Sequence, residues 1–154
     1  MTVTRRLAAI LAADVAGYSR LIGADESGTL ERLRVLRREL LDPKIAEHRG
    51  RLVKTTGDGF LVAFGSVVDA LRCAAEVQRE MAGRGAEMPP ERRIEYRIGI
   101  NVGDIVVEDG DIFGDGVNVA ARIEALAEPG GIFVSARVQE DAAGRLDLLF
   151  EDIG

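Results

Sequence analysis

The stretch Arg51-Leu-Val-Lys-Thr-Thr-Gly-Asp-Gly-Phe-Leu-Val-Ala-Phe64 decides how the chain folds. Its two ends, residues 51–56 and 60–64, are rich in residues that favour β-strands, and they flank Gly57-Asp58-Gly59. An Asp-Gly step between two such runs is the strongest short signal for a β-hairpin. We therefore expect an antiparallel pair of strands in the middle of the chain, with Asp58 at its tip.

The sequence before this hairpin predicts a strand and a helix. Leu7 to Ala13 is an apolar run typical of a buried strand. Leucines at helical spacing predict an amphipathic helix from Glu26 to about Leu41. Asp42-Pro43 either starts a further helical turn or kinks the helix, and Gly50 ends it.

The sequence after the hairpin repeats this alternation and sets the fold class. We expect a helix beginning at Ser66, a loop at 83–90, strands at 94–102 and 104–108, a helix from about Asp115 to Ala127, a strand at 132–135, a short helix at 136–142 and a last strand at 146–153. This order predicts an α+β fold, a ferredoxin-like (palm-type) sandwich whose mostly antiparallel sheet carries packed helices. A doubly wound parallel fold fits less well, because short turns join two of the strand pairs.

Composition narrows the possible functions. The 154 residues are 47% hydrophobic and 30% charged, as in an ordinary globular domain. A net charge of −6 argues against nucleic acid or an anionic membrane as a partner, and with no signal segment or membrane span we expect a cytoplasmic protein. The single cysteine, Cys73, and the single histidine, His48, exclude cysteine-rich or histidine-rich metal sites, so any metal chemistry would use carboxylates, which favour Mg²⁺ or Mn²⁺.

Two aspartates are candidate metal ligands. Asp14 ends the first buried strand, and Asp58 lies at the hairpin tip. In a ferredoxin-like sheet the first strand and the central hairpin can be neighbours, which would bring both carboxylates together. Two close carboxylates repel each other and need a cation between them, as in a two-metal phosphoryl-transfer site. The alternative is that Asp58 only forms the turn and Asp14 only caps the strand.

Asn118 and Arg122 are candidate ligands for a sugar phosphate. They lie four residues apart in the predicted helix 115–127, so they project from one face. Asn has poor helix propensity, which indicates a role other than helix stability. An amide can bind a ring oxygen and a guanidinium can hold a phosphate, whereas the alternative is a solvated helix face. The apolar residues expected to pack this helix are Val117, Ala120, Ala121, Ile123 and Leu126.

Lys54 and Asp111 form a candidate base-reading pair. A lysine only donates hydrogen bonds and an ionised aspartate only accepts them. Adenine offers an acceptor at N1 and a donor at N6, whereas guanine offers the reverse. The pair therefore matches adenine and leaves buried polar groups unpaired with guanine, although either residue alone would be an ordinary surface charge.

Taken together, these residues resemble the catalytic domain of the class III nucleotidyl cyclases, the adenylate and guanylate cyclases. The similarity rests on three motifs in order: Leu11-Ala-Ala-Asp-Val-Ala-Gly-Tyr-Ser19, Val53-Lys-Thr-Thr-Gly-Asp-Gly-Phe60 and Asp111-Ile-Phe-Gly-Asp-Gly-Val-Asn-Val-Ala-Ala-Arg122. It implies one catalytic domain over residues 1–154. Because family members usually continue into another strand, we expect this chain to be a fragment lacking the last C-terminal strand or strands.

The resemblance implies a role for each candidate residue. Asp14 and Asp58 would bind two Mg²⁺ or Mn²⁺ ions per active site, with the carbonyl of Val15 as a further ligand. Lys54 and Asp111 would read adenine. In addition, Asn118 would orient the ribose, Arg122 would stabilise charge on the phosphorus, and the amides of Gly17, Tyr18 and Ser19 would hold the triphosphate.

The resemblance also implies a homodimer with ATP as substrate. One domain would supply the metal ligands of each active site, and the other would supply the base, ribose and transition-state residues across the interface. The implied products are 3′,5′-cyclic AMP and pyrophosphate, formed by in-line attack of the ribose 3′-hydroxyl on the α-phosphorus with the help of both ions. The alternatives are a guanylate cyclase, which the Lys–Asp pair disfavours, and a catalytically inactive cyclase-like module that binds nucleotide or a partner.

Overall fold

A six-stranded sheet forms the centre of the protein. The structure, a computed structural model, describes residues 3–146 and residue 150. The strands follow the order β2-β3-β1-β4-β5, and β6 also pairs with β4. In chain order the elements are β1 (Val3–Val15), α1 (Tyr18–Ala24), α2 (Glu26–Leu36), the π-helical turn η1 (Arg37–Leu41), α3 (Asp42–Glu47), β2 (Arg51–Thr55), β3 (Gly59–Phe64), α4 (Val67–Gly85), the 3-10 turn η2 (Pro90–Arg92), β4 (Tyr96–Glu108), β5 (Asp111–Phe113), α5 (Asp115–Leu126), β6 (Ile132–Val134) and α6 (Ala136–Ala142).

The first four strands build the ferredoxin-like core that the sequence predicts. β1, the β2–β3 hairpin and β4 pair with one another antiparallel, in the spatial order β2-β3-β1-β4. This is the arrangement of a β-α-β-β-α-β unit. The short strands β5, antiparallel, and β6, parallel, extend the sheet beyond β4. The α+β class with a mostly antiparallel sheet and packed helices is therefore confirmed.

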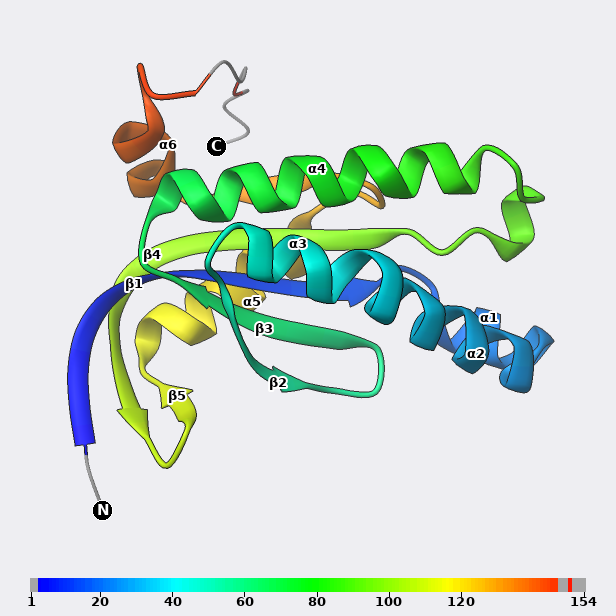
Figure 1. Cartoon of the computed structure of the whole chain (residues 1–154), viewed down its shortest axis with the longest axis horizontal. Coiled ribbons are helices and arrows are strands. Elements are labelled where there is room, and N and C mark those ends of the chain that lie inside the picture. Colours follow the sequence, from blue (N-terminus) through cyan, green and yellow to red (C-terminus); the bar gives the residue numbers. More distant parts are fainter. Residues whose placement is uncertain (1–2, 147–149, 151–154) are drawn as a thin grey trace.

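Helices cover the two faces of the sheet unequally. α3 and α4 lie over one face, and α5 lies over the other (Figure 1). Because side chains alternate along a strand, Leu11 of β1 joins the larger core under α4, and Ile10 joins the smaller core beside α5. Asp14 has the same parity as Ile10, so its side chain lies on the α5 face.

The sheet bends strongly beyond its centre. β1 and β4 are each 13 residues long, and the first part of β1 bends together with the end of β4, to which it is paired, and with β5 (Figure 1). As a result β2 and β5, the first and last strands in the sheet order, lie close together. The bend therefore brings side chains from both edges of the sheet to one place.

The two strands expected at 94–102 and 104–108, whether paired or consecutive, are not separate. Residues 96–108 form one strand rather than two, and the turn is Asp109-Gly110, with φ of 51° and 82°. Two consecutive positive φ values are typical of a type I′ hairpin, which favours Asp-Gly. The segment Asp111–Phe113 is consequently a strand, which the prediction missed.

The first long helix continues past Pro43 and ends one residue earlier than predicted. Pro43 lies in the first turn of α3, and the π-helical turn before it accommodates a residue that has no N–H. The left-handed residue after the helix is Arg49 (φ 62°), not Gly50. The amide of Gly50 instead donates a 2.8 Å hydrogen bond to the carbonyl of Ile45, as in a Schellman motif.

The expected last strand, 146–153, lies almost entirely outside the described residues. Leu146 and Phe150 are described, and neither is part of a strand. Among the described helices, none has the length and apolar character needed to cross a membrane.

Candidate functional site

The ends of β1 and of the β2–β3 hairpin meet. The amide of Val15 donates a 2.7 Å hydrogen bond to the carbonyl of Asp58, and Asp14 lies opposite Gly59 in the register of β1 and β3. Only glycine fits here, because a Cβ at residue 59 would lie 2.1 Å from the carbonyl oxygen of Ala13. The backbone thus places the two candidate metal ligands, Asp14 and Asp58, next to each other.

Arg97 binds the carboxylate of Asp14. The two residues face each other in the register of β1 and β4. The guanidinium donates from Nε to Oδ1 over 3.0 Å and from Nη2 to Oδ2 over 2.9 Å. Such two-pronged pairs are among the strongest hydrogen-bonded ion pairs in proteins. The hydrogen bond to Asp14 accordingly raises the pKa of Arg97 above its usual value.

Glu124 of α5 brings a further carboxyl group to Asp14. Glu124 is only 7% exposed, which is unusual for a glutamate. Burial, followed by a hydrogen bond with Asp14 and the negative charge of that residue, raises the pKa of Glu124 to about 8. The charge of Asp58 also acts on Glu124 and on Arg97. We refer to Asp14, Asp58, Arg97 and Glu124 as the aspartate cluster.

Helix α5 reaches this cluster because a glycine faces it. A Cβ at Gly99 of β4 would lie 2.3 Å from the amide nitrogen of Glu124 and 2.7 Å from the carbonyl oxygen of Ala120. Nearer the start of the helix, Asn101 donates a 3.1 Å hydrogen bond to the carbonyl of Gly116. Close backbone contact and a buried hydrogen bond therefore fix the position of α5 on the sheet.

The bend of the sheet brings Lys54 and Asp111 together. Lys54 lies on β2 and Asp111 on β5, and Nζ of the lysine lies 3.7 Å from Oδ1 of the aspartate. Both side chains are partly exposed. The same Oδ1 accepts a 2.7 Å hydrogen bond from the amide of Ile112, which fixes the carboxylate at the start of β5. This geometry presents donor and acceptor groups side by side at the surface.

Asn118 and Arg122 lie on the exposed face of α5. The Arg122 side chain is 73% exposed and makes a loose contact of 3.8 Å with Asp115 of the same helix. Both residues are therefore accessible from outside this chain. Leu126, four residues beyond Arg122, lies on the same face and is 71% exposed.

The predicted packing face of this helix is partly wrong. The residues of α5 that are buried are Gly116, Ala120 and Glu124, whereas Ala121 and Leu126 are exposed. The close contact at Gly99 turns the face with Ala120 and Glu124 toward the sheet. A charged residue thus occupies a core position and a leucine faces outward.

The segment between β1 and α1 contains the predicted triphosphate cradle. Gly17 adopts a left-handed conformation (φ 65°) and precedes Tyr18 and Ser19, the first residues of α1. The first amides of a helix have no acceptor within the helix, so they are available to an anion. Their role toward a phosphate remains a prediction.

The chemistry of the aspartate cluster fits a hard divalent cation. Asp14, Asp58 and Glu124 bring three carboxyl groups to one guanidinium, and the raised pKa of Glu124 reflects its burial and the excess of nearby negative charge. Carboxylate oxygens are the ligands that Mg²⁺ and Mn²⁺ prefer. Asp14 and Asp58 would hold such ions, with the carbonyl of Val15 directly after Asp14 in the chain.

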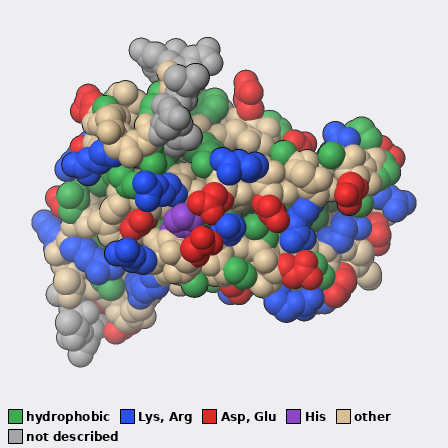
Figure 2. All heavy atoms as spheres, turned by 45° about the horizontal axis from the view of Figure 1, so that its top comes forward, with side chains coloured by type: hydrophobic (Ala, Val, Ile, Leu, Met, Phe, Trp, Pro, Cys, Tyr) green, Lys and Arg blue, Asp and Glu red, His purple; other side chains and the backbone are tan. Residues whose placement is uncertain are grey.

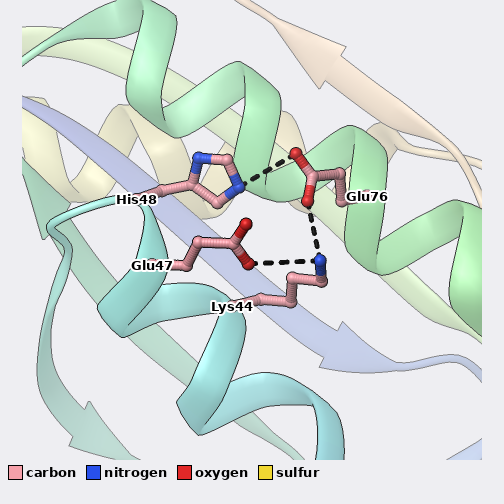
Figure 3. Close-up of polar contacts among 4 residues, drawn as sticks. All are labelled: Lys44, Glu47, His48 and Glu76. Atoms are coloured by element: carbon pink, nitrogen blue, oxygen red, sulfur yellow. Dashed lines mark hydrogen bonds and ion pairs between the residues drawn. The ribbon is translucent and has the colours of Figure 1, made fainter.

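A second charged cluster links α3 to α4 and has a different character (Figure 3). Nζ of Lys44 lies 2.8 Å from Glu76 and 3.2 Å from Glu47, and Nε2 of His48 lies 3.0 Å from Glu76. The histidine is visible at the surface among acidic and basic side chains (Figure 2). Glu47, His48 and Glu76 could together hold a metal ion, but the ammonium group of Lys44 already forms ion pairs with both carboxylates. We therefore interpret these four residues as a structural contact, the α3–α4 clamp.

Sequence reasoning missed two members of the aspartate cluster. Arg97 is indistinguishable from other arginines until the pairing of β1 with β4 is known. Glu124 left a weak signal, since it lies four residues after Ala120, on what proves to be the packing face of the helix. The interruption of a packing face by an acidic residue could have indicated a buried charge.

Comparison with known proteins identifies the family. Residues 4–150 match the sequence model described as "Adenylate and Guanylate cyclase catalytic domain". The chain therefore belongs to this family, as its motifs predict, and is a nucleotidyl cyclase domain.

Two relatives are named for the same activity. The chain is 54% identical over 153 residues to "Putative adenylate cyclase 3" of Rhizobium meliloti, covering 99% of this chain and 26% of that protein. It is 33% identical over 139 residues to "Adenylate cyclase" of Streptomyces coelicolor, covering 90% of this chain and 35% of that protein. The chain thus spans about a quarter to a third of the length of these relatives.

Solved structures have the same fold. The chain is 56% identical to an adenylate/guanylate cyclase/hydrolase from Silicibacter pomeroyi, with a TM-score of 0.94 over 99% of this chain and 89% of the other. The guanylyl cyclase Cya2 matches with a TM-score of 0.82 and 26% identity, over 94% and 82% of the two chains. The similarity thus extends to proteins named for either nucleotide.

Proposed function

We propose that this domain is an adenylate cyclase catalytic domain that converts ATP to 3′,5′-cyclic AMP and pyrophosphate. The observation that carries the choice of adenine is the 3.7 Å pair of Lys54 and Asp111. A donor beside an acceptor complements N1 and N6 of adenine, and with guanine each group would face a group of its own kind. The names of the two curated relatives agree with this choice.

Each part of the site has a separate task in this proposal. Asp14 and Asp58 bind the ions and so hold the triphosphate against β1, where the amides of α1 contact its phosphates. Two Mg²⁺ or Mn²⁺ ions supply activation of the ribose 3′-hydroxyl and neutralisation of the leaving pyrophosphate. Asn118 orients the ribose. Arg122 stabilises the negative charge that develops on the reacting phosphate.

We further propose that the active site forms between two copies of the chain in head-to-tail arrangement. Asn118 and Arg122 lie on the outer face of α5, whereas Asp14 lies beneath that helix, next to its buried Glu124. Within one chain, the metal-binding half and the ribose- and phosphate-binding half of the active site therefore face different directions. Exposed apolar residues on the elements that carry Asp111 and Arg122 supply surface for an interface with a second chain; they are Phe113 of β5 and Leu126 of α5.

The proposed function is tested by the product that the purified chain forms. With Mn²⁺ and ATP we expect cyclic AMP, identified by mass spectrometry, with specific activity that rises with protein concentration because a dimer must form. The same assay with GTP should give much less product. Nucleotide binding without any cyclic product, at concentrations where the chain is dimeric, would instead support the inactive binding module.

A further inference from the structure

Arg97 engages both oxygens of the Asp14 carboxylate, the group that would also bind a metal ion. Both oxygens of the Asp14 carboxylate accept a hydrogen bond from the guanidinium, at 3.0 and 2.9 Å. A divalent ion on the same carboxylate would lie within a few Å of this positive charge, and at that distance like charges repel strongly. A metal ion at Asp14 and Arg97 in its present position therefore disfavour each other.

The structure also supplies a second acceptor for Arg97. Nη1 of the same guanidinium lies 3.5 Å from the carbonyl oxygen of Ala125 in the last turn of α5. The last carbonyls of a helix have no intrahelical donor, and the helix dipole makes this end negative. The negative charge of Asp58 also acts on Arg97. A small movement of the guanidinium would exchange the Asp14 carboxylate for the Ala125 carbonyl as its hydrogen-bond acceptor.

We propose that Arg97 is a positioning residue that acts as an internal cation: it holds Asp14 in the metal-free protein and moves toward the C-terminal end of α5 when a divalent ion binds. The inference rests on the proposed function, because it takes Asp14 as a metal ligand. Helix α5 also carries Asn118 and Arg122. The displacement would thus connect metal binding at one active site to the helix that presents the ribose- and phosphate-binding residues of the other active site in the proposed dimer.

The first test measures the affinity of the whole chain for Mn²⁺ without nucleotide, by electron paramagnetic resonance of the free ion. Arg97→Gln removes the competing charge and should tighten Mn²⁺ binding by about tenfold. Arg72→Gln is the matched control, since Arg72 is an exposed arginine on α4, which packs on the opposite face of the sheet. This variant should bind Mn²⁺ within about twofold of the original protein.

The second test follows Arg97 itself and does not depend on the variant folding. In an NMR titration of the unaltered chain with Mg²⁺, the Nε–H resonance of Arg97 should shift as the ion binds. In Asp14→Asn the same titration should leave this resonance unchanged.

The outcomes separate the inference from the proposed function. The inference would be overturned if Mn²⁺ bound the unaltered chain and Arg97→Gln with the same affinity and Mg²⁺ did not shift the Arg97 resonance. The proposed function would remain intact in that case. Absence of binding in both proteins would remove the metal site, and both proposals with it. Tighter binding in Arg97→Gln and a shifted resonance support the displacement.

Discussion

The two charged clusters of the molecule are built from similar residues but differ in balance. In the α3–α4 clamp, hydrogen bonds from Lys44 lower the pKa of Glu76, and those to Glu76 and Glu47 raise the pKa of Lys44. Both directions mean that the charged forms stabilise each other. In the aspartate cluster, burial and the neighbouring Asp14 raise the pKa of Glu124 to about 8, which means that its charged form is disfavoured.

This difference separates a structural contact from a candidate active site. In the clamp, Lys44 forms ion pairs with both carboxylates and His48 contacts one of them, so every acidic group has a partner within the cluster. The aspartate cluster concentrates more acidic groups than its one guanidinium can neutralise, and it lies where β1, the hairpin and α5 meet. Unbalanced charge of this kind is common at functional sites, where a substrate or ion completes the balance.

The largest expected effect comes from removing a charge of the aspartate cluster. Asp14→Asn should reduce cyclic AMP formation by at least about a thousandfold, because the proposed metal ligand is lost. Glu76→Gln makes the matching change in the clamp and should keep activity within about twofold. The measurement is the initial rate of cyclic AMP formation with Mn²⁺ and ATP, compared for variants that are both folded. An equal loss of cyclic AMP formation in both variants would show that the two clusters do not differ in their importance for activity.

The next effect concerns the nucleotide. The double variant Lys54→Glu, Asp111→Cys reverses the donor and acceptor pattern at the base and should change the ratio of ATP to GTP turnover by about a hundredfold toward GTP. Rates with both nucleotides under identical conditions provide the measurement. An unchanged ratio would mean that these two residues do not contact the base.

A smaller effect is expected on the pH dependence of stability without metal. Glu124 has a usual pKa of 4.5 when unfolded and about 8 when folded. Between these values the folded protein holds a proton that the unfolded chain has lost, so the free energy of unfolding falls as pH rises from about 4.5 to about 8. In Glu124→Gln the free energy of unfolding should fall less over this pH range, by on the order of 2–4 kcal/mol. Urea unfolding in chelator at pH 5, 7 and 9 measures it, and identical pH profiles would contradict the account.

The smallest effect concerns the clamp. His48→Ala should lower the free energy of unfolding by about 1 kcal/mol or less, since partly exposed ion pairs contribute little. Where His48 is protonated, the effect should shrink further at high salt, because salt screens its pair with Glu76. Urea unfolding at low and at high salt checks both statements. A loss of several kcal/mol would show that the clamp is a larger part of the core than its exposure implies.

Much of the fold could be predicted from local sequence. The hairpin around Asp58, the N-cap at Ser66, whose Oγ accepts from the amide of Asp69 over 3.1 Å, and the helix that begins at Asp115 are all present. Each depends on residues close together in the chain. The prediction failed at the turn of Asp109-Gly110, because two strand-like runs around Gly103 gave no sign that one strand continues through both.

The candidate site could be predicted only in part, for a related reason. The motifs identified Asp14, Lys54 and Arg122, but contacts across the sheet were invisible. The pair of Asp14 with Arg97 depends on strand register, and the burial of Glu124 depends on the missing side chain of Gly99. Such contacts join residues far apart in sequence, and spacing within one segment carries no information about them.

The central claim is that each active site takes its metal ligands from one chain and Arg122 from another. Asp14→Asn and Arg122→Ala should each be nearly inactive alone. Mixed in equal amounts and allowed to exchange, they form dimers with one intact site, and cyclic AMP formation should return to about a quarter of the original rate. If the mixture stays as inactive as either variant, although mixed dimers are detected, then the two halves of the site do not come from different chains.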